Sequence, residues 1–268
     1  MMEQASDLRL VPMQSLAKGG RWRVEAMRSY SVDQLLWFTR GQGRLIADGI
    51  TRGYGAHNVI FLPAGTMHAF ELGPQVYGTA VFFPTNHGLE VPEKSLHLRI
   101  RDARDQAEIN LILDNLQREI EGDRPARRQA LTHHAGLLSV WLERQRLDHD
   151  DALAASDAAR RLVRRFSALV ETRFHTGDSV SDYAKALGVT STHLTRVCKE
   201  TCGRTASEFL SDRKISEARR LLADTGLPIK DIASGLGFAS AAYFTRSFQA
   251  HTGNPPSLFR ESTAPRHH

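Results

Sequence analysis

The sequence has little cysteine and no long apolar run. Its 268 residues include only two cysteines, too few for a disulfide framework in a chain of this length. No apolar stretch approaches the roughly 18–20 residues that a membrane-spanning helix needs. The N-terminal segment carries acidic side chains and lacks the apolar core of a secretory signal. These absences exclude the disulfide-rich secreted and membrane classes, and we expect a cytoplasmic protein with no membrane partner.

Excess charge is missing from the first part of the chain and present in the rest. Residues 1–150 contain 18 basic and 18 acidic side chains, whereas residues 151–268 contain 17 and 12, so the net charge of +5 lies in the C-terminal part. A length of 268 residues predicts two domains. A basic balance confined to one domain favours a phosphate-rich partner for that domain, although a chance excess on a solvated surface would look the same.

The segment 33–84 has the pattern of short strands separated by turns. The strand-like runs are rich in Val, Ile, Phe, Tyr and Trp, and turns containing Gly or Pro interrupt them. Strands of this length and spacing predict an antiparallel sandwich or small barrel. The five runs are DQLLWFT, RLIAD, NVIFL, MHAFE and YGTAVFF.

Two amphipathic helices are predicted after Pro92, over 101–121 and 126–147. Their apolar residues recur three or four positions apart, with charged residues between them. An exposed apolar stripe would be an aggregation hazard in a monomer, so the helices either cover the barrel or pair with a second copy of the chain. We expect a homodimer whose interface includes Leu131, Leu138 and Trp141.

The C-terminal part contains an internal repeat. VSDYAKALG at 180–188 matches IKDIASGLG at 229–237 with an offset of 49, and beyond the glycines the offset becomes 50. In each copy a first helix ends in Leu-Gly, and a Ser or Thr then caps a second helix. This order is typical of a helix-turn-helix unit, which we expect at about 180–201 and 229–252. Two copies in register on a basic segment favour nucleic-acid binding over unrelated helical hairpins.

A single helix is predicted between the two copies, over 205–224. About 20 residues at ~1.5 Å each give a rod of ~30 Å. One turn of B-DNA is ~34 Å long, so recognition helices at the two ends of the rod would enter successive major grooves on one face of a duplex.

The repeat and the tail GFASAAYFTRSFQAHTGNPPSLFR closely resemble the AraC/XylS family of bacterial transcription regulators over residues 158–260. The resemblance implies seven helices and a sequence-specific regulator, expected to be an activator, that contacts promoter or operator DNA and RNA polymerase. An arginine in each unit would grip guanine or phosphate, and a phosphate contact without base readout stays open. By motif position the DNA-facing residues are Ser191, Thr192, Thr195 and Arg196, then Ala242, Tyr243, Thr245 and Arg246.

The N-terminal barrel resembles the cupin-like sensor arm of the same family. FLPAGTMHAF carries Pro63, Gly65 and His68 in the order of the later cupin motif, but Gly43–Gly53 lacks the His-x-His and Glu of the earlier one. One histidine does not make the three- or four-ligand set that a metal requires, so we expect no metal, no cofactor and no enzymatic activity. The implied fold is α+β: an N-terminal cupin-like antiparallel β-barrel with two amphipathic helices, then an all-α domain.

A small-molecule effector is the expected ligand of the barrel. His68 is either a polar contact to it or a hydrogen-bonded core group. Trp37 and Tyr77 either line the pocket or belong to the core, and Arg44 either binds a carboxylate or lies on the surface. Two other hypotheses remain open: a metal-dependent cupin enzyme fused to a DNA-binding module, and a regulator whose barrel only dimerises.

These expectations divide the chain into three parts. Residues 1–148 form an effector-binding and dimerisation domain, 149–156 an acidic linker of small residues, and 157–268 a DNA-binding domain. Cys198 and Cys202, four positions apart at the end of a recognition helix, are either a thiol switch or two unrelated buried residues.

Overall fold

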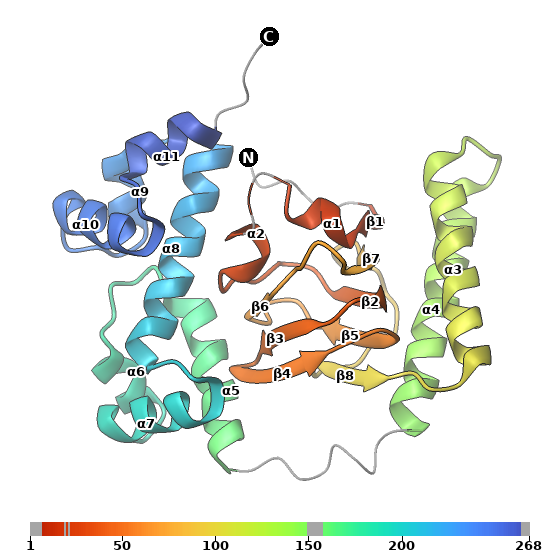
Figure 1. Cartoon of the computed structure of the whole chain (residues 1–268), viewed down its shortest axis with the longest axis horizontal. Coiled ribbons are helices and arrows are strands. Elements are labelled where there is room, and N and C mark those ends of the chain that lie inside the picture. The colour runs from red at the N-terminus through yellow and green to blue at the C-terminus, as the bar shows by residue number, and fades with distance from the viewer. Residues whose placement is uncertain (1–6, 19, 21, 149–157, 264–268) are drawn as a thin grey trace.

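The computed structural model describes residues 7–18, 20, 22–148 and 158–263. An N-terminal half of two β-sheets and a helical hairpin precedes a C-terminal half made of helices (Figure 1). This confirms the predicted α+β class with a β-rich first domain and an all-α second one. The expected linker 149–156 lies outside the described residues. Within the described chain, no helix combines the length and the apolar character needed to span a membrane.

Eight strands of the described chain form two antiparallel sheets. The five-stranded sheet has the order β1-β7-β2-β5-β8, and the three-stranded sheet has the order β4-β3-β6. All five predicted strands are confirmed, as β2, β3, β5, β6 and β7. The other three were missed because they are short and carry polar or turn-forming residues. The bounds are β1 Arg9–Pro12, β2 Gln34–Arg40, β3 Gly43–Ala47, β4 Ile50–Tyr54, β5 Asn58–Leu62, β6 His68–Phe70, β7 Tyr77–Phe82 and β8 Leu96–Arg99.

The two sheets face each other without closing into the predicted barrel. Among the described strands no ladder joins one sheet to the other, so the architecture is an open sandwich. Strand β6 has only three residues, and its outer edge pairs with Arg28 through an isolated bridge instead of with another strand. Apolar side chains of both sheets meet between them, and we call this cluster the sandwich core. Its members include Leu36, Phe38, Leu45, Tyr54, Ile60, Leu62, Phe70 and Phe82.

Helices α3 (Ala103–Glu121) and α4 (Arg127–Asp148) cover the outer face of the five-stranded sheet (Figure 1). Strand β5 is therefore buried on both faces, which explains its uninterrupted apolar run. Leu138 and Trp141 are 0% and 1% exposed, and Leu131 packs against the same cluster. The assignment of Leu138 and Trp141 to a dimer interface is therefore wrong, because the sheet of their own chain already covers them, whereas Leu131 is only partly buried.

The C-terminal half contains seven helices within its described residues, the number that the family resemblance implies. Two further short helices, α1 (Met13–Leu16) and α2 (Trp22–Glu25), lie between β1 and β2 in the N-terminal half. The C-terminal bounds are α5 Ala158–Arg173, α6 Val180–Ala186, α7 Ser191–Cys202, α8 Ala206–Asp224, α9 Ile229–Gly235, α10 Ala241–Thr252 and α11 Pro256–Thr263.

The two halves share apolar contacts on the side of the sheets away from α3 and α4 (Figure 1). Met27, Met67 and Ala69 pack among side chains of α5, α6 and α7, in a cluster that we call the first-unit core. Trp22 packs against the second-unit core of α8 to α11, where its ring meets Phe259 edge-on at 5.5 Å. The N-terminal half therefore contacts both helical units.

Two histidines of the N-terminal half are held in their neutral form. His68 is 0% exposed, and its Nδ1 lies 2.8 Å from the carbonyl oxygen of Thr66. Burial, helped by the charge of Arg28, lowers the pKa of His68 to about 3. Burial, helped by Arg52, lowers the pKa of His97 to about 4. Both imidazoles thus stay neutral at pH values where an exposed histidine is protonated.

These two histidines predict a loss of stability in mild acid. Below about pH 6.5 the unfolded chain protonates them while the folded chain does not, so the free energy of unfolding falls as the pH decreases from about 6.5 toward 4. Each histidine contributes up to ~1.4 kcal/mol per pH unit in this window. Urea unfolding between about pH 7.5 and 5 should show a shallower decline for His68→Phe, which keeps the ring volume. Parallel declines for variant and wild type would contradict the buried neutral state of His68.

The packing of α4 predicts opposite outcomes at a buried and an exposed leucine. Leu138 of α4 is 0% exposed, whereas Leu258 of α11 is 48% exposed. Leu138→Ala should lower the free energy of unfolding by about 2–5 kcal/mol, because it leaves a cavity between helix and sheet. Leu258→Ala, the control, should change it by no more than ~0.5 kcal/mol. Chemical denaturation measures both values, and equal losses would mean that α4 does not pack on the sheet as described.

Candidate nucleic-acid interface

The first helix-turn-helix unit consists of α6 and α7, and side chains cap both helices. The hydroxyl of Ser179 accepts a hydrogen bond from the amide of Asp182, whose carboxylate accepts one from the amide of Ser179. This reciprocal capping satisfies two amide groups that the first helical turn leaves free. The hydroxyl of Thr190 accepts from the amide of His193 at 3.1 Å and so begins α7. The predicted order of helix, turn and capped helix is present.

The second unit, α9 and α10, repeats this arrangement with one extra residue in the turn. Helix α9 starts 49 residues after α6, whereas α10 starts 50 residues after α7. Gly237 has a φ of +66°, and a Cβ at this position would collide with the backbone of Gly177. Only glycine therefore suits the close approach of this turn to the segment before α6. The hydroxyl of Ser240 caps α10 by accepting from the amide of Tyr243 at 3.1 Å.

Each recognition helix turns apolar residues into the core and its polar residues outward. Leu194 and Phe244 are both 0% exposed. The eight residues that the family resemblance assigns to DNA contact all lie on the open sides of α7 and α10. Thr195 and Thr245 are partly exposed, and the exposed ones are Ser191, Thr192, Arg196, Ala242, Tyr243 and Arg246.

The two arginines differ in their surroundings. Arg196 is 58% exposed, and its guanidinium contacts the carboxylate of Glu200 one turn later at 3.0 Å. Arg246 forms no ion pair with any of the described side chains. An exposed pair at this spacing contributes only about 0.3–0.5 kcal/mol, so a phosphate or a guanine can take the place of Glu200. Arg246 has no such ion pair to give up before it binds DNA.

Helix α8 carries both units and sets the distance between them. It has 19 residues and is therefore about 28 Å long. Its first turns belong to the first-unit core through Phe209 and Leu210, and its later turns belong to the second-unit core through Ala218 and Leu222. Figure 1 shows α7 and α10 near opposite ends of α8, both on the side away from the sheets.

A buried ion-pair network ties α8 to α5. The guanidinium of Arg213 is 6% exposed and donates to both carboxylate oxygens of Glu171, at 2.7 and 3.1 Å. It also donates to Glu217 at 3.2 Å and lies 3.9 Å from the ring centre of Phe174. Sequence reasoning missed this network. The spacing of Arg213 and Glu217 on one helix was its only local signal, since Glu171 comes from a distant part of the chain.

The four predicted effector contacts do not come together. His68 faces the sandwich core side, whereas Trp37 faces the opposite side of the five-stranded sheet and donates its indole N–H to Asn110 at 2.9 Å. Arg44 is on the surface and pairs with Glu71 at 2.8 Å. Tyr77 is 51% exposed. Only His68 therefore lies on the side of the sandwich core.

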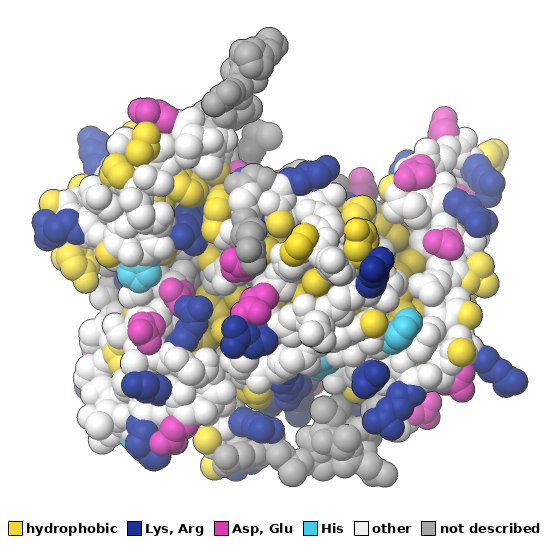
Figure 2. Space-filling model, in the orientation of Figure 1, with side chains coloured by type: hydrophobic (Ala, Val, Ile, Leu, Met, Phe, Trp, Pro, Cys, Tyr) yellow, Lys and Arg dark blue, Asp and Glu magenta, His cyan; other side chains and the backbone are white. Residues whose placement is uncertain are grey.

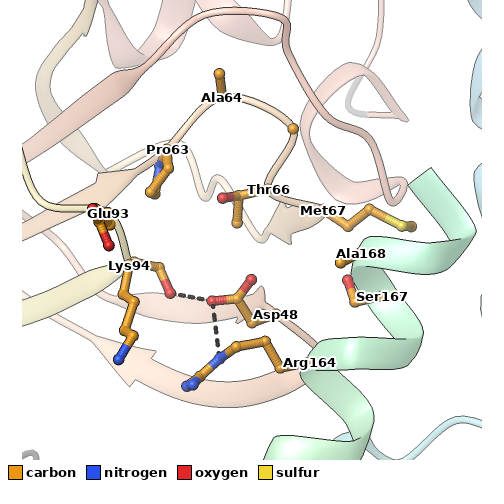
Figure 3. Close-up of a pocket in the computed structure, with 12 residues that line it drawn as sticks. Asp48, Pro63, Ala64, Thr66, Met67, Glu93, Lys94, Arg164, Ser167 and Ala168 are labelled. Carbon is orange, nitrogen blue, oxygen red and sulfur yellow. Dashed lines mark hydrogen bonds and ion pairs between the residues drawn. The ribbon is translucent and has the colours of Figure 1, made fainter. Parts of the chain in front are cut away.

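A hollow of about 220 Å³ lies where the sheets meet α5, as Figure 3 shows. Asp48, in the turn between β3 and β4, accepts a hydrogen bond from the hydroxyl of Ser95 and lies 3.7 Å from Arg164 of α5. The hollow is thus bordered by both halves of the chain and crossed by an ion pair between them. It lies outside the sandwich core, where the sequence placed the effector.

The described residues contain no group of three or more His, Cys, Asp or Glu side chains arranged to hold a metal ion. Cys198 and Cys202 are free and buried, and the thiol of Cys202 contacts the carbonyl oxygen of Cys198 at 3.0 Å. Burial raises the pKa of Cys198 to about 12, so its thiolate is strongly disfavoured. This environment favours two structural cysteines over a thiol switch.

Comparisons with known proteins identify the C-terminal half. A helix-turn-helix domain model matches residues 183–262. An uncharacterized HTH-type transcriptional regulator of Bacillus subtilis, YfiF, is 40% identical over 98 residues, which are 34% of this chain and 31% of that protein. The probable transcription factor PqrA of Proteus vulgaris is 36% identical over 86 residues, or 32% of this chain and 70% of PqrA. The chain therefore spans about a third of one relative and more than two thirds of the other.

Two solved structures are similar to a lesser degree. ToxT of Vibrio cholerae covers 99% of this chain, and 100% of ToxT is covered, with 15% identity and a TM-score of 0.47. The C-terminal domain of AraT from Geobacillus stearothermophilus has 26% identity and a TM-score of 0.39, over 42% of this chain and 98% of that domain. The domain match and the relatives carry the assignment: the chain belongs to the family of AraC-type helix-turn-helix transcription regulators.

Proposed function

We propose that this protein is a sequence-specific, DNA-binding regulator of transcription that responds to a small-molecule effector. The observation that carries the proposal is the pair of capped helix-turn-helix units held on one helix about 28 Å long. This length is close to one turn of B-DNA, so α7 and α10 suit successive major grooves. Relatives named as a probable transcription factor and as an HTH-type transcriptional activator support regulation, and the second supports activation.

The proposed DNA contacts come from the open sides of α7 and α10. Arg196 and Arg246 are the strongest candidates, since a guanidinium can bind guanine or phosphate through two hydrogen bonds. The second unit presents Ala242 and Tyr243 in place of longer polar side chains. It is therefore proposed to read sequence through apolar contact with thymine methyl groups and through DNA shape. Ser191, Thr192, Thr195 and Thr245 complete the proposed set.

We assign effector binding and dimerisation to residues 1–148 and DNA binding to residues 157–268. The outer surface of α3 and α4 supports a homodimer, because large apolar side chains remain exposed there although the inner faces are covered. Figure 2 shows hydrophobic side chains at intervals along the outer edge of this hairpin. A cytoplasmic location and contact with RNA polymerase follow from the proposed role. The exposed residues are Leu111, Leu137, Val140 and Leu147.

DNA binding by the full chain should fall steeply with salt, because phosphate contacts release counterions. Arg196→Ala or Arg246→Ala should weaken binding to a sequence selected from random DNA by about 1–3 kcal/mol if the arginine reads a base. A phosphate contact would instead weaken binding to all sequences and reduce the salt slope by about 1. Arg44→Ala, which removes the same charge from the N-terminal surface, is the control. Fluorescence anisotropy measures all four proteins.

Two results would contradict the proposed DNA interface. One is binding that does not depend on salt, or the absence of any selected sequence. The other is an equal loss of affinity in Arg44→Ala and Arg196→Ala, which would show that overall charge and not the recognition helix determines affinity.

The proposed homodimer predicts that charges on the outer face of α4 separate the subunits. The double variant Leu137→Asp, Leu147→Asp should sediment as a monomer at tens of micromolar while its circular dichroism stays that of the wild type, because both side chains are already exposed. Leu258→Asp, at an exposed position of α11, should leave the dimer intact. A wild-type chain that sediments as a monomer under these conditions would overturn the dimer.

A further inference from the structure

Strand β6 and the segment that pairs with it have two different faces. Arg28 and His68 exchange backbone hydrogen bonds, at 3.0 Å in one direction and 2.8 Å in the other. Their neighbours Met27 and Met67 point the opposite way, into the first-unit core of the DNA-binding half. One side of this pair of segments therefore faces the sheets, and the other faces the recognition unit.

Arg28 is a cation without a matching acid. Its Nε and Nη1 atoms are excluded from solvent and have no hydrogen-bond partner. Its guanidinium lies 5.5 Å from the ring centre of Tyr30 and 5.4 Å from that of Phe70, and no described carboxylate forms an ion pair with it. Burial lowers the pKa of Arg28, and Tyr30 offsets part of this effect. A charge in such a place is costly unless an anion accompanies it.

His68 adds an unused acceptor beside this cation. The neutral imidazole donates from Nδ1 to the carbonyl oxygen of Thr66 at 2.8 Å, which leaves Nε2 as an acceptor. His68 is 0% exposed, and its Nε2 has no hydrogen-bond partner among the described residues. The imidazole stacks on Tyr30 with ring centres 5.7 Å apart, so its orientation is held from two sides.

We propose that Arg28 and His68 form a binding site for a small organic acid that carries a hydroxyl group. Its carboxylate would accept a hydrogen bond from Nη1 of Arg28, and its hydroxyl would donate to Nε2 of His68. Arg28, Ser29 and Tyr30 are partly exposed, so this site lies near the molecular surface. Arg44, the carboxylate partner expected from sequence, is already paired with Glu71 at the surface.

This inference rests on the proposed function, since it names the chemical class of the effector. A ligand bound to Arg28 and His68 would fix the backbone that also carries Met27, Met67 and Ala69 against α5 and α7. It would therefore favour the arrangement in which the two halves are docked. The change in free energy between docked and undocked forms would equal the difference in the ligand's binding free energy for the two forms.

Thermal unfolding of the full chain at constant ionic strength tests the site with two matched pairs of probes. Glycolate differs from acetate, and mandelate from phenylacetate, only by a hydroxyl group, and mandelamide removes the charge. At least one hydroxy acid should raise Tm in a saturable way, because it binds the folded state only. The corresponding acid without the hydroxyl should give a smaller shift, and mandelamide should give none.

Three variants separate binding from structure. Arg28→Met should abolish the shift with every acid, while Arg44→Met should keep it. His68→Phe retains the ring on Tyr30 and should make each hydroxy acid equal to its partner without the hydroxyl. If Arg28→Met does not fold, as circular dichroism would show, the loss of hydroxyl discrimination in His68→Phe still tests the site.

The proposal is overturned if none of the four acids raises Tm, if mandelamide acts as well as mandelate, or if folded Arg28→Met keeps the shift. DNA affinity measured on the same preparations distinguishes this failure from a failure of the proposed function. Salt-dependent DNA binding without an acid-dependent Tm would leave the regulator and remove only the organic acid.

Discussion

The structure of the DNA-binding half depends on one helix being shared by two cores. Phe209 fixes the first turns of α8 in the first-unit core, and Leu222 fixes its end in the second-unit core. Both units bury apolar side chains against this helix, so its length determines how far apart α7 and α10 lie. The buried guanidinium of Arg213 then fixes the rotation of α8 against α5, because its hydrogen bonds to Glu171 require one orientation.

The N-terminal half is joined to this assembly through short segments with two faces. Met67, which precedes β6, and Ala69 alternate with His68 and Phe70, so this segment contributes to the first-unit core and to the sandwich core. The ion pair of Asp48 with Arg164 lies at the same boundary. These contacts combine apolar packing with an ion pair, and a ligand that binds the docked arrangement more tightly would favour it by that difference in affinity.

Local signals predicted the elements and the doubled motif, whereas contacts between distant residues escaped prediction. The caps Thr190 and Ser240 and the strand-like runs are written in consecutive residues, and the structure has them where they were expected. The same periodicity that located α4 could not say what covers Leu138, since a sheet and a second subunit need the same apolar stripe. Arg28 gave no signal at all. Its isolation depends on which side chains the fold brings near it, and nothing in the sequence around it shows that no acid does.

In the proposed complex, α7 and α10 bind one face of a duplex, one helical turn apart. Hydroxyl-radical footprinting of the full chain, on a duplex selected from random DNA by its binding, tests this most directly. The account predicts two protected segments on the same face, with centres about 10 base pairs apart. A single protected segment, or two segments on opposite faces of the duplex, would contradict it.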